Sequence, residues 1–311
     1  MRFGVVVGAP DLHGYVAAVR RAEDLGYDLV LCSDHLDLSG AHFSHFAPVP
    51  ALMTAALSAP RVRIGTAMLN QDLRHPAVLA REAASLDVLS GGRLELGLGA
   101  GWLASEYQAA GIPFDPAGQR VRRFAEYVQV VKGVIAEPEF SFQGEFFTIE
   151  AMPGLPAPLQ LPHPPVMIGA IGPRLLALAG READIVSINL LRLPDPGNAA
   201  LAERISWVRE AAGERFDSLE LQLPITAAVV SGRGRADAIA AAARSGDPFF
   251  ARLAAWTDVD RLARSPMVLT GTPPEMAERL RELGERHGIG AVMVPMPQLE
   301  ALGAVIPHLR N

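Results

Sequence analysis

The sequence predicts an α/β protein, a (β/α)8 barrel with loop insertions. Short apolar segments alternate with segments of helical periodicity along nearly all of the 311 residues. Eight of the short segments are mostly apolar and do not alternate with polar residues, as strands buried on both faces of a parallel sheet are. A closed eight-stranded barrel accounts for them most simply, and an open doubly wound sheet is the alternative that the sequence leaves open.

The strand candidates are runs rich in Val, Ile and Leu that end at Gly, Pro or polar residues. In chain order they are Phe3–Val7, Leu29–Cys32, Val62–Leu69, Leu94–Leu98, Val166–Ile168, Ile185–Ile188, a strand within 219–230, and Ala291–Val294. Residues 41–60 and 151–173 carry no Lys, Arg, Asp or Glu but contain several prolines. These two stretches therefore predict long loops or covered core, and not membrane helices.

The helices expected between the strands have apolar residues at spacings of three and four. The first, over 15–25, stops at Gly26, and Pro76 opens another in its first turn. Thr272 and Glu275 form a capping box that starts the last helix. The remaining helices are expected at Val121–Ala136, Pro173–Arg181, Leu201–Ala212 and 236–243.

Residues 137–164 interrupt this alternation and predict an insertion within one domain that spans 1–311. Aromatic residues on either side of Gly144 favour a small hairpin, from Phe140–Phe142 to Phe146–Ile149, followed by an extended proline-rich loop. We expect the phenylalanines to form core beneath a lid and not a partner surface.

The composition excludes several classes of function. With 28 basic and 34 acidic side chains the net charge is −6 and no basic stripe is present, so nucleic acid is not an expected partner. The one cysteine, Cys32, excludes a disulfide framework and a zinc site built on several thiolates. The apolar run near the N-terminus is too short for a signal peptide, so we expect a cytoplasmic protein with no membrane partner.

No dinucleotide-binding fingerprint is present. The nearest candidate, GLGAGW at 97–102, places Trp102 where the third glycine belongs and follows a fourth strand instead of a first one. Its glycines indicate either the close approach of a planar group to a strand end or a barrel turn that requires small residues.

A further pattern is spread along the chain in blocks. These are Ser33-Asp34-His35, Arg63-Ile64-Gly65-Thr66, Arg74-His75-Pro76-Ala77, Leu79-Ala80-Arg81, Leu86–Arg93, GLGAGW at 97–102, Gly111–Phe114 with Arg120, Gly169 with Gly172, and Leu269–Pro273. Together they resemble the luciferase-like monooxygenase superfamily, and within it the branch of oxidoreductases that use the deazaflavin coenzyme F420. The resemblance covers nearly the whole chain, and its central block is highly specific.

The resemblance implies a cofactor over the C-terminal ends of the barrel strands. It places His35 by the reactive face of the ring, where an imidazole can move a proton while a hydride moves at carbon five. Ala67 and Met68 fall where relatives carry a non-prolyl cis peptide behind the central ring, and the Asn70 amide can meet the pyrimidine edge. Taken alone, the residues also allow a structural histidine, barrel core at 67–68 and a turn residue at Asn70.

Gly101 and Trp102 follow the fourth strand, and the resemblance places both at the cofactor. Sugar-phosphate-oxidising relatives carry a glutamate as the acid at the position of Trp102, so the indole argues against that chemistry. Trp102 is expected to wall the substrate pocket. Glu106, one turn further, is the nearest carboxylate if this loop forms a helix.

Gly169, Ala170, Ile171 and Gly172 precede Pro173, which opens a helix. Free amides at a helix start provide an anion site that needs no lysine cluster, and the resemblance places the cofactor's phosphate there. A simple strand-to-helix turn is the alternative.

The loop over 41–46 carries His42 and His45 between aromatic residues. A metal site there would lack a third ligand, because no Asp or Glu lies close in the sequence. We expect a mobile substrate lid, with a buried structural loop as the alternative.

The resemblance therefore predicts an oxidoreductase that transfers a hydride between coenzyme F420 and a small organic substrate, with no metal. Deazaflavin lacks the nitrogen through which flavin reacts readily with oxygen, so such a site suits a dehydrogenase or a reductase. The alternatives are an FMN-dependent monooxygenase that receives reduced flavin, and a non-catalytic relative that binds a flavin or nothing. A homodimer is expected from the family and from the many apolar barrel helices.

Overall fold

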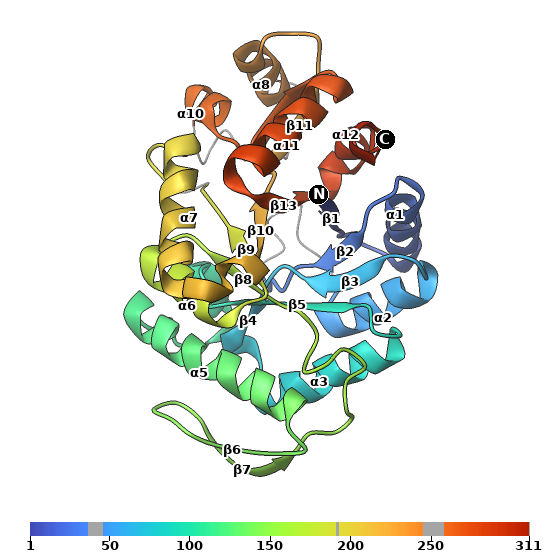
Figure 1. Ribbon diagram of the computed structural model, residues 1–311. Coiled ribbons are helices and arrows are strands. Elements are labelled where there is room, and N and C mark those ends of the chain that lie inside the picture. Colours follow the sequence, from blue (N-terminus) through green and yellow to red (C-terminus); the bar gives the residue numbers. More distant parts are fainter. Residues whose placement is uncertain (37–45, 191–192, 245–257, 311) are drawn as a thin grey trace.

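The computed structural model describes residues 1–36, 46–190, 193–244 and 258–310, and parallel strands in it close into a barrel (Figure 1). The sheet has nine strands, of which the two-residue β4 pairs only with β5 while β1 joins β13 and β3 joins β5 to complete the ring. The ring consists of β1 (Arg2–Val6), β2 (Leu29–Cys32), β3 (Arg63–Thr66), β5 (Leu94–Gly99), β8 (Val166–Ala170), β9 (Ile185–Ile188), β10 (Glu220–Pro224) and β13 (Ile289–Pro295). The closed ring confirms the (β/α)8 barrel and excludes the open doubly wound sheet.

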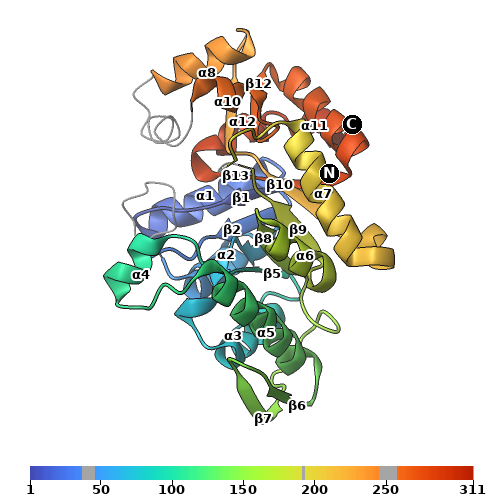
Figure 2. The same ribbon diagram turned by 90° about the vertical axis from the view of Figure 1, so that its left-hand side faces the viewer.

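Most helices pack around the outside of the ring, whereas α4 projects from one end of it and α8 and α10 lie away from the ring strands (Figures 1 and 2). The helices of the described chain are α1 (Leu12–Asp24), α2 (Pro48–Ser58), α3 (Pro76–Leu89), α4 (Ala104–Ala110), α5 (Ala117–Ala136), α6 (Pro173–Glu182), α7 (Asn198–Ala212), α8 (Arg235–Ala243), α10 (Val259–Arg264), α11 (Pro273–His287), α12 (Leu299–Gly303) and α13 (Pro307–Arg310), with 3-10 turns at Gln71–Leu73, Gly213–Ser218 and Met296–Gln298. The expected capping box of Thr272 and Glu275 starts α11. In the part of the chain that the structure describes, no helix is both long enough and apolar enough to cross a bilayer.

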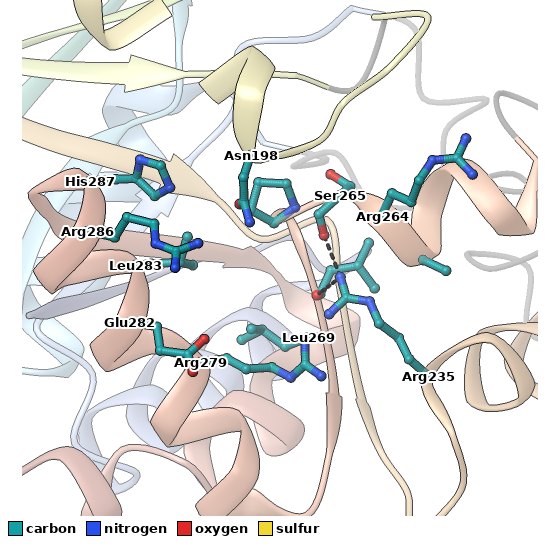
Figure 3. Close-up of a pocket in the computed structure, with 13 residues that line it drawn as sticks. Asn198, Arg235, Arg264, Ser265, Leu269, Arg279, Glu282, Leu283, Arg286 and His287 are labelled. Carbon is teal, nitrogen blue, oxygen red and sulfur yellow. Dashed lines mark hydrogen bonds between the residues drawn. The ribbon is translucent and has the colours of Figure 1, made fainter. Parts of the chain in front are cut away.

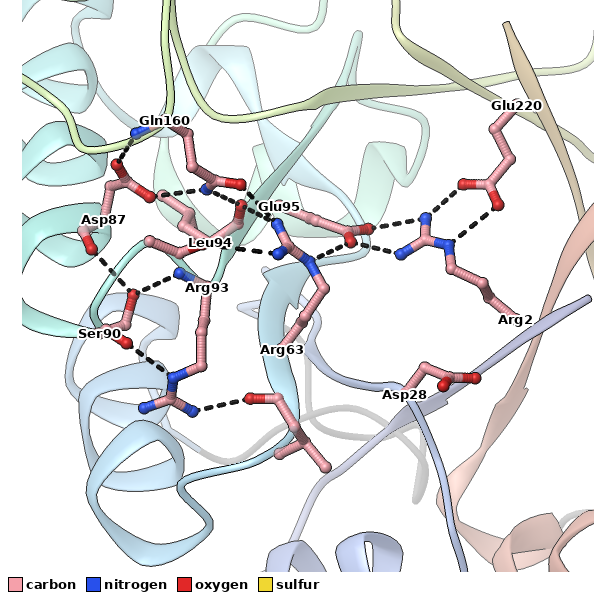
Figure 4. Close-up of polar contacts among 12 residues, drawn as sticks. Arg2, Asp28, Arg63, Asp87, Ser90, Arg93, Leu94, Glu95, Gln160 and Glu220 are labelled. Carbon is pink, nitrogen blue, oxygen red and sulfur yellow. Dashed lines mark hydrogen bonds and ion pairs between the residues drawn. The ribbon is translucent and has the colours of Figure 1, made fainter.

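Ion pairs close the end of the barrel at which the strands begin (Figure 4). Arg2 begins β1, Arg63 begins β3 and Glu95 is the second residue of β5. The Glu95 carboxylate, 2% exposed, accepts from Arg2 Nη1 at 2.5 Å and from Arg63 Nε at 2.6 Å, and Arg2 also pairs with Glu220. Opposite charges thus surround a carboxylate that would be costly to bury alone. This end is held by structural contacts, and the C-terminal end of the strands is where a barrel carries its function.

Helix α2 lies where the sequence analysis expected a loop or covered core. Pro48 and Pro50 were the reason for that expectation, because proline breaks a helix interior. Both lie in the first turn of α2, where the backbone N–H groups have no helical acceptor and a proline removes no hydrogen bond. The helix then buries Ala51, Leu52 and Ala55 against the barrel.

At two places the structure has two strands where the sequence predicts one. Val62–Leu69 forms β3 and then β4 (Leu69–Asn70), because the Met68 side chain packs against β5 and β8 and takes residues 67–68 out of the ladder. The segment 219–230 forms β10 and then β11 (Ala227–Val230). β11 pairs in parallel with β12 (Val268–Gly271), which the sequence analysis did not predict as a strand, in a two-stranded sheet outside the ring.

The insertion forms the expected hairpin, from β6 (Glu139–Gln143) to the antiparallel β7 (Thr148–Pro153). Phe140 and Phe142 stack with their ring centroids 6.3 Å apart and pack against the main core. Helix α5 makes room for this packing at Gly133, where a Cβ atom would lie 2.1 Å from the Phe140 ring. The hairpin is therefore attached to the outside of the barrel through α5.

Candidate active site

His35 follows β2 at the C-terminal end of the barrel, and Glu106 holds its imidazole. Nδ1 of His35 lies 2.7 Å from Glu106 Oε1, and the same oxygen accepts the backbone N–H of Leu36 at 3.1 Å. The two side chains are 12% and 4% exposed. A carboxylate that accepts a hydrogen bond from Nδ1–H fixes the orientation and the tautomer of the ring. In that tautomer Nε2 is the acceptor nitrogen of the imidazole.

Glu106 reaches His35 because β5 is followed by a tight turn and the short helix α4. Gly101 begins the turn with a φ of 72°, a left-handed conformation that glycine adopts without strain. Gly111, also left-handed, ends α4 as its C-cap. Glu106 and Tyr107 are the buried residues of this helix. In Figure 2, α4 projects at one end of the barrel and the N-terminus lies at the other.

Trp102 stands beside His35 in the turn before α4. The two rings meet edge to face, with centroids 5.7 Å apart and an interplanar angle of 81°. The indole remains 39% exposed. It therefore offers an accessible flat apolar surface next to the imidazole, which suits an expected wall of a substrate pocket.

Asp34 connects the end of β2 to the turn at Asn70. Its Oδ2 atom accepts from Arg74 Nη1 at 2.7 Å and from the backbone N–H of Asn70 at 3.0 Å. Asp34 is 6% exposed, and Arg74 provides the opposite charge that such burial requires. Asp34 thus fixes the chain on both sides of the site, immediately before His35 and at Asn70.

The peptide bond between Ala67 and Met68 is cis, the geometry that the resemblance implies here. The Met68 side chain fills space that three glycines leave open: Cβ atoms at Gly97, Gly99 and Gly169 would lie 2.9, 3.2 and 3.0 Å from Met68 atoms. A Cβ at Gly97 would also lie 1.9 Å from the carbonyl oxygen of Thr66. The sequence analysis considered a planar ligand as the reason for these glycines. Within the strands, it is the Met68 side chain and the Thr66 carbonyl group that approach the glycine backbone closely.

Asn70 belongs to a polar network with Tyr107 and Asp72. The Tyr107 hydroxyl lies 2.9 Å from Asn70 Oδ1 and 2.7 Å from Asp72 Oδ2, and Arg123 pairs with Asp72. Burial, together with the Asp72 carboxylate, raises the pKa of Tyr107, so the hydroxyl keeps its proton. Gly101 is required beside this network, because a Cβ there would lie 1.8 Å from the Tyr107 oxygen. The Asn70 oxygen is therefore engaged by the protein, whereas its Nδ2 group has no hydrogen bond to any described residue.

The turn from β8 to α6 runs through Gly169, Ala170, Ile171 and Gly172. Gly172 is the N-cap of α6 and no side chain caps this helix start. A Cβ at Gly172 would meet no atom of the described chain within 4 Å. The first amides of α6 are thus approachable, and the helix dipole favours an anion beside them.

The expected site residues follow four strands, β2, β3, β5 and β8, that are consecutive neighbours in the ring. His35 contacts Trp102, and Met68 packs against Gly169. Gly172 does not contact His35 in the described chain. His42 and His45 lie outside the described residues. Among those that are described, no three His, Cys, Asp or Glu side chains gather as a metal site would require.

The sequence indicated Glu106 as a nearby carboxylate but not its contact with His35, and it indicated no role for Tyr107 or for the pairing of Asp34 with Arg74. The spacing of residues holds a signal for the position of Glu106. Glu106 lies four residues after Trp102 in a segment bounded by Gly101 and Gly111, and a helix there turns it back toward the strand ends.

Known proteins resemble this chain in sequence and in fold. The family model for luciferase-like monooxygenases matches residues 2–308. The chain is 35% identical over 171 residues to an F420-dependent glucose-6-phosphate dehydrogenase of Beutenbergia cavernae, covering 52% of this chain and 48% of that protein. An enzyme of the same name from Nakamurella multipartita is 29% identical over 289 residues, covering 86% of this chain and 82% of that protein. The matched region thus spans about half of the first relative and most of the second.

A third relative uses a different cofactor. The FMNH2-dependent dimethylsulfone monooxygenase of Pseudomonas putida is 33% identical over 109 residues, covering 35% of this chain and 30% of that protein. Among solved structures, an F420-dependent secondary alcohol dehydrogenase bound to an F420-acetone adduct superposes with a TM-score of 0.80. The match covers 100% of this chain and 99% of that chain at 19% identity, which is a likeness of fold.

Proposed function

The chain belongs to the luciferase-like monooxygenase family, and from this premise we propose that it is an oxidoreductase that transfers a hydride between coenzyme F420 and a small organic substrate. The observation that carries the proposal is the contact of His35 with Glu106, beside Trp102, at the C-terminal end of the barrel. It gives the site a proton-transferring group of fixed orientation in the place where barrel enzymes carry out their chemistry.

The choice of F420 is supported by two relatives that carry the cofactor in their names, one of them matched over 86% of this chain. The strand ends also fit a flat cofactor with an anionic tail. The open, uncapped start of α6 after Gly172 would receive a phosphate, and the Nδ2 group of Asn70 would meet the polar edge of the ring. The backbone at Ala67 and Met68 would lie behind the ring, and Gly101 and Trp102 would border it. Bound there, deazaflavin supplies a carbon that accepts or donates a hydride.

The protein's own part in the reaction is the movement of a proton. In the oxidative direction, Nε2 of His35 takes the proton of a substrate hydroxyl while the substrate carbon loses its hydride; in the reductive direction, His35 returns the proton. Glu106 acts as a positioning residue, since it holds Nδ1 and offsets the charge that the imidazole gains. Trp102 covers one side of His35 and limits the access of water.

The substrate is proposed to differ from that of the two named dehydrogenases. Trp102 stands where sugar-phosphate-oxidising members of the family carry their glutamate acid. An indole neither donates that proton nor favours a polar sugar ring, so an apolar alcohol or carbonyl compound suits this surface better.

A second candidate is an FMN-dependent monooxygenase, which the relative from Pseudomonas putida favours. Titration of the purified protein into F420 and into FMN, followed by the fluorescence of each cofactor, separates the two candidates. We expect saturable quenching of F420 and weaker quenching of FMN. Tight binding of FMN alone would replace the first candidate by the second, and binding of neither would leave a non-catalytic relative.

We further propose that the protein works in the cytoplasm as a homodimer, with a small-molecule substrate and neither nucleic acid nor membrane as partner. The net charge of −6 supports the absence of nucleic acid. Exposed leucines on the neighbouring helices α2 and α3, Leu57 and Leu89, support the dimer.

A further inference from the structure

A pocket on the flank of the barrel is lined by cationic side chains (Figure 3). The first residue of α7, the beginnings of α8 and β12, the end of α10 and the C-terminal half of α11 form its walls. It has no lining residue in common with the site around His35. The cationic groups are Arg235 from α8, Arg264 from α10, and Arg279 and Arg286 from α11, with His287 beside them.

Positive charge in this pocket exceeds negative charge. Among the described lining residues Glu282 is the one acidic side chain, and Arg264 has a distant pairing with Asp195 at 4.0 Å. In Figure 3 the guanidinium groups of Arg235, Arg279 and Arg286 point toward the space between α8 and α11, whereas Arg264 points outward. Three arginines thus converge on one space without a matching set of carboxylates.

Arg235 is the most enclosed of the three. Its Nη2 group donates to the carbonyl oxygens of Ser265 at 2.5 Å and Val268 at 2.7 Å, and its Nε atom is buried without a hydrogen-bond partner. Burial and the neighbouring Arg279 lower the pKa of this guanidinium to about 10. A partly buried cation whose partners are neutral carbonyls, with a second cation beside it, is stabilised when an anion enters.

His287 supplies an independent observation on the other side of the pocket. In the described part of the chain its Nε2 atom is also buried without a hydrogen-bond partner. Buried polar atoms in native proteins nearly always have a partner, so an exception calls for an explanation. The two residues that carry these atoms, on separate elements, both line the cationic pocket.

We propose that this pocket binds the phosphate group of a phosphorylated small molecule, as a ligand site separate from the hydride-transfer site. A phosphate presents three terminal oxygens and up to two charges, so it can accept from Arg235, Arg279 and Arg286 at once. A carboxylate presents two oxygens and one charge, and it would satisfy fewer of these donors. The ligand class is therefore a phosphate ester or pyrophosphate and not a simple carboxylic acid.

Calorimetric titration with inorganic pyrophosphate, at constant ionic strength set with sodium chloride, tests this proposal. We expect saturable binding by the native chain and a loss of affinity of about tenfold in Arg279→Gln, the scale of one charge-assisted hydrogen bond. Arg281→Gln is the matched control, because Arg281 lies on the same helix but pairs with Glu278 and the carbonyl of His308. Arg235→Gln is a second test variant, although Arg235 also supports the backbone at 265 and 268.

Two further arms locate the site and identify its chemistry. Succinate should bind at least tenfold more weakly than pyrophosphate, and F420 should bind Arg279→Gln as it binds the native chain. Failure of pyrophosphate to bind the native chain, or an equal loss in Arg279→Gln and Arg281→Gln, would overturn the proposal. Equal binding of succinate would overturn the choice of phosphate. None of these outcomes depends on whether the proposed hydride transfer is correct.

Discussion

His35 and Glu106 are 71 residues apart in the sequence, and their side chains meet at 2.7 Å at the C-terminal end of the barrel. Closure of the ring brings β2 and β5 to either side of β3, and the turn at Gly101 then sends α4 back over the strand ends. The contact places a buried carboxylate behind the one imidazole that the proposed reaction uses.

Glu106→Gln should slow F420-dependent turnover roughly 10- to 100-fold, because an amide neither fixes the tautomer of His35 nor offsets the charge of a protonated ring. Binding of F420 should change much less. Turnover is followed by the absorbance of F420, with a substrate found by screening apolar alcohols and ketones. Gln108→Ala, on the exposed face of the same helix, serves as the control. Equal losses in both variants would remove Glu106 from the mechanism.

Gly172→Asp should stabilise the fold and weaken cofactor binding. Aspartate is a favourable N-cap, worth about 1 kcal/mol at a helix that no side chain caps, and the position has open space for it. Its charge would repel a phosphate bound at the same amides and weaken F420 binding about tenfold. Gly172→Asn, a neutral cap of the same shape, should keep most of the affinity. If both variants bind F420 as the native chain does, the phosphate lies elsewhere.

Gly97→Ala should reduce the free energy of unfolding by about 3 kcal/mol, the upper range for overpacking a core. Its Cβ would lie 1.9 Å from the Thr66 carbonyl oxygen and 2.9 Å from the Met68 sulfur. Gly172→Ala, where the new Cβ meets no described atom within 4 Å, should change stability by less than about 1 kcal/mol. Urea denaturation measures both values. A neutral Gly97→Ala would show that β3 can move away from β5.

The exposed leucines around the end of α3 predict a dimer interface. Leu57, Leu89 and Leu161 are 77%, 66% and 82% exposed. The Asp87 carboxylate of α3 accepts from the backbone N–H groups of residues 159 and 160, so the loop that carries Leu161 lies beside the end of α3. Several exposed large apolar side chains on one face are typical of a protein interface.

Light scattering after size-exclusion chromatography tests this interface. The native chain should elute as a dimer and Leu89→Glu as a monomer, because a buried unpaired carboxylate is costly. Leu12→Glu changes an exposed leucine at the start of α1 and should leave the dimer intact. A native monomer, or a Leu89→Glu dimer, would contradict the assignment.

The strands and helices with a clear periodicity were predictable from sequence. The bounds of Leu29–Cys32 and Ile185–Ile188 agree with β2 and β9, and the capping box of Thr272 and Glu275 is present. The helix at 48–58 was not predicted, because prolines at a helix start look the same as prolines in a loop, although its buried residues do form covered core. The sequence analysis also missed β11 and β12, because β12 is a short run whose partner is not in the barrel.

The candidate site was predictable in its location but not in its contacts. His35, Trp102 and Gly172 each stand at the end of a strand, and that position could be derived from the alternation of elements. The contact of Glu106 with His35 could not be derived, since it depends on the neighbour relations of the closed ring. The requirement for glycine at position 101 could not be derived in full either. It comes from the nearby Tyr107 hydroxyl as well as from the φ angle of the residue. The roles of these residues in cofactor binding stay predictions.

A crystal structure of the protein with F420 would locate the cofactor directly. We expect the deazaflavin ring at the C-terminal ends of β2, β3 and β5, facing His35, with its phosphate within hydrogen-bond distance of the amides that follow Gly172. A ring bound at any other part of the molecule, or a phosphate far from α6, would show that the proposed cofactor site is wrong.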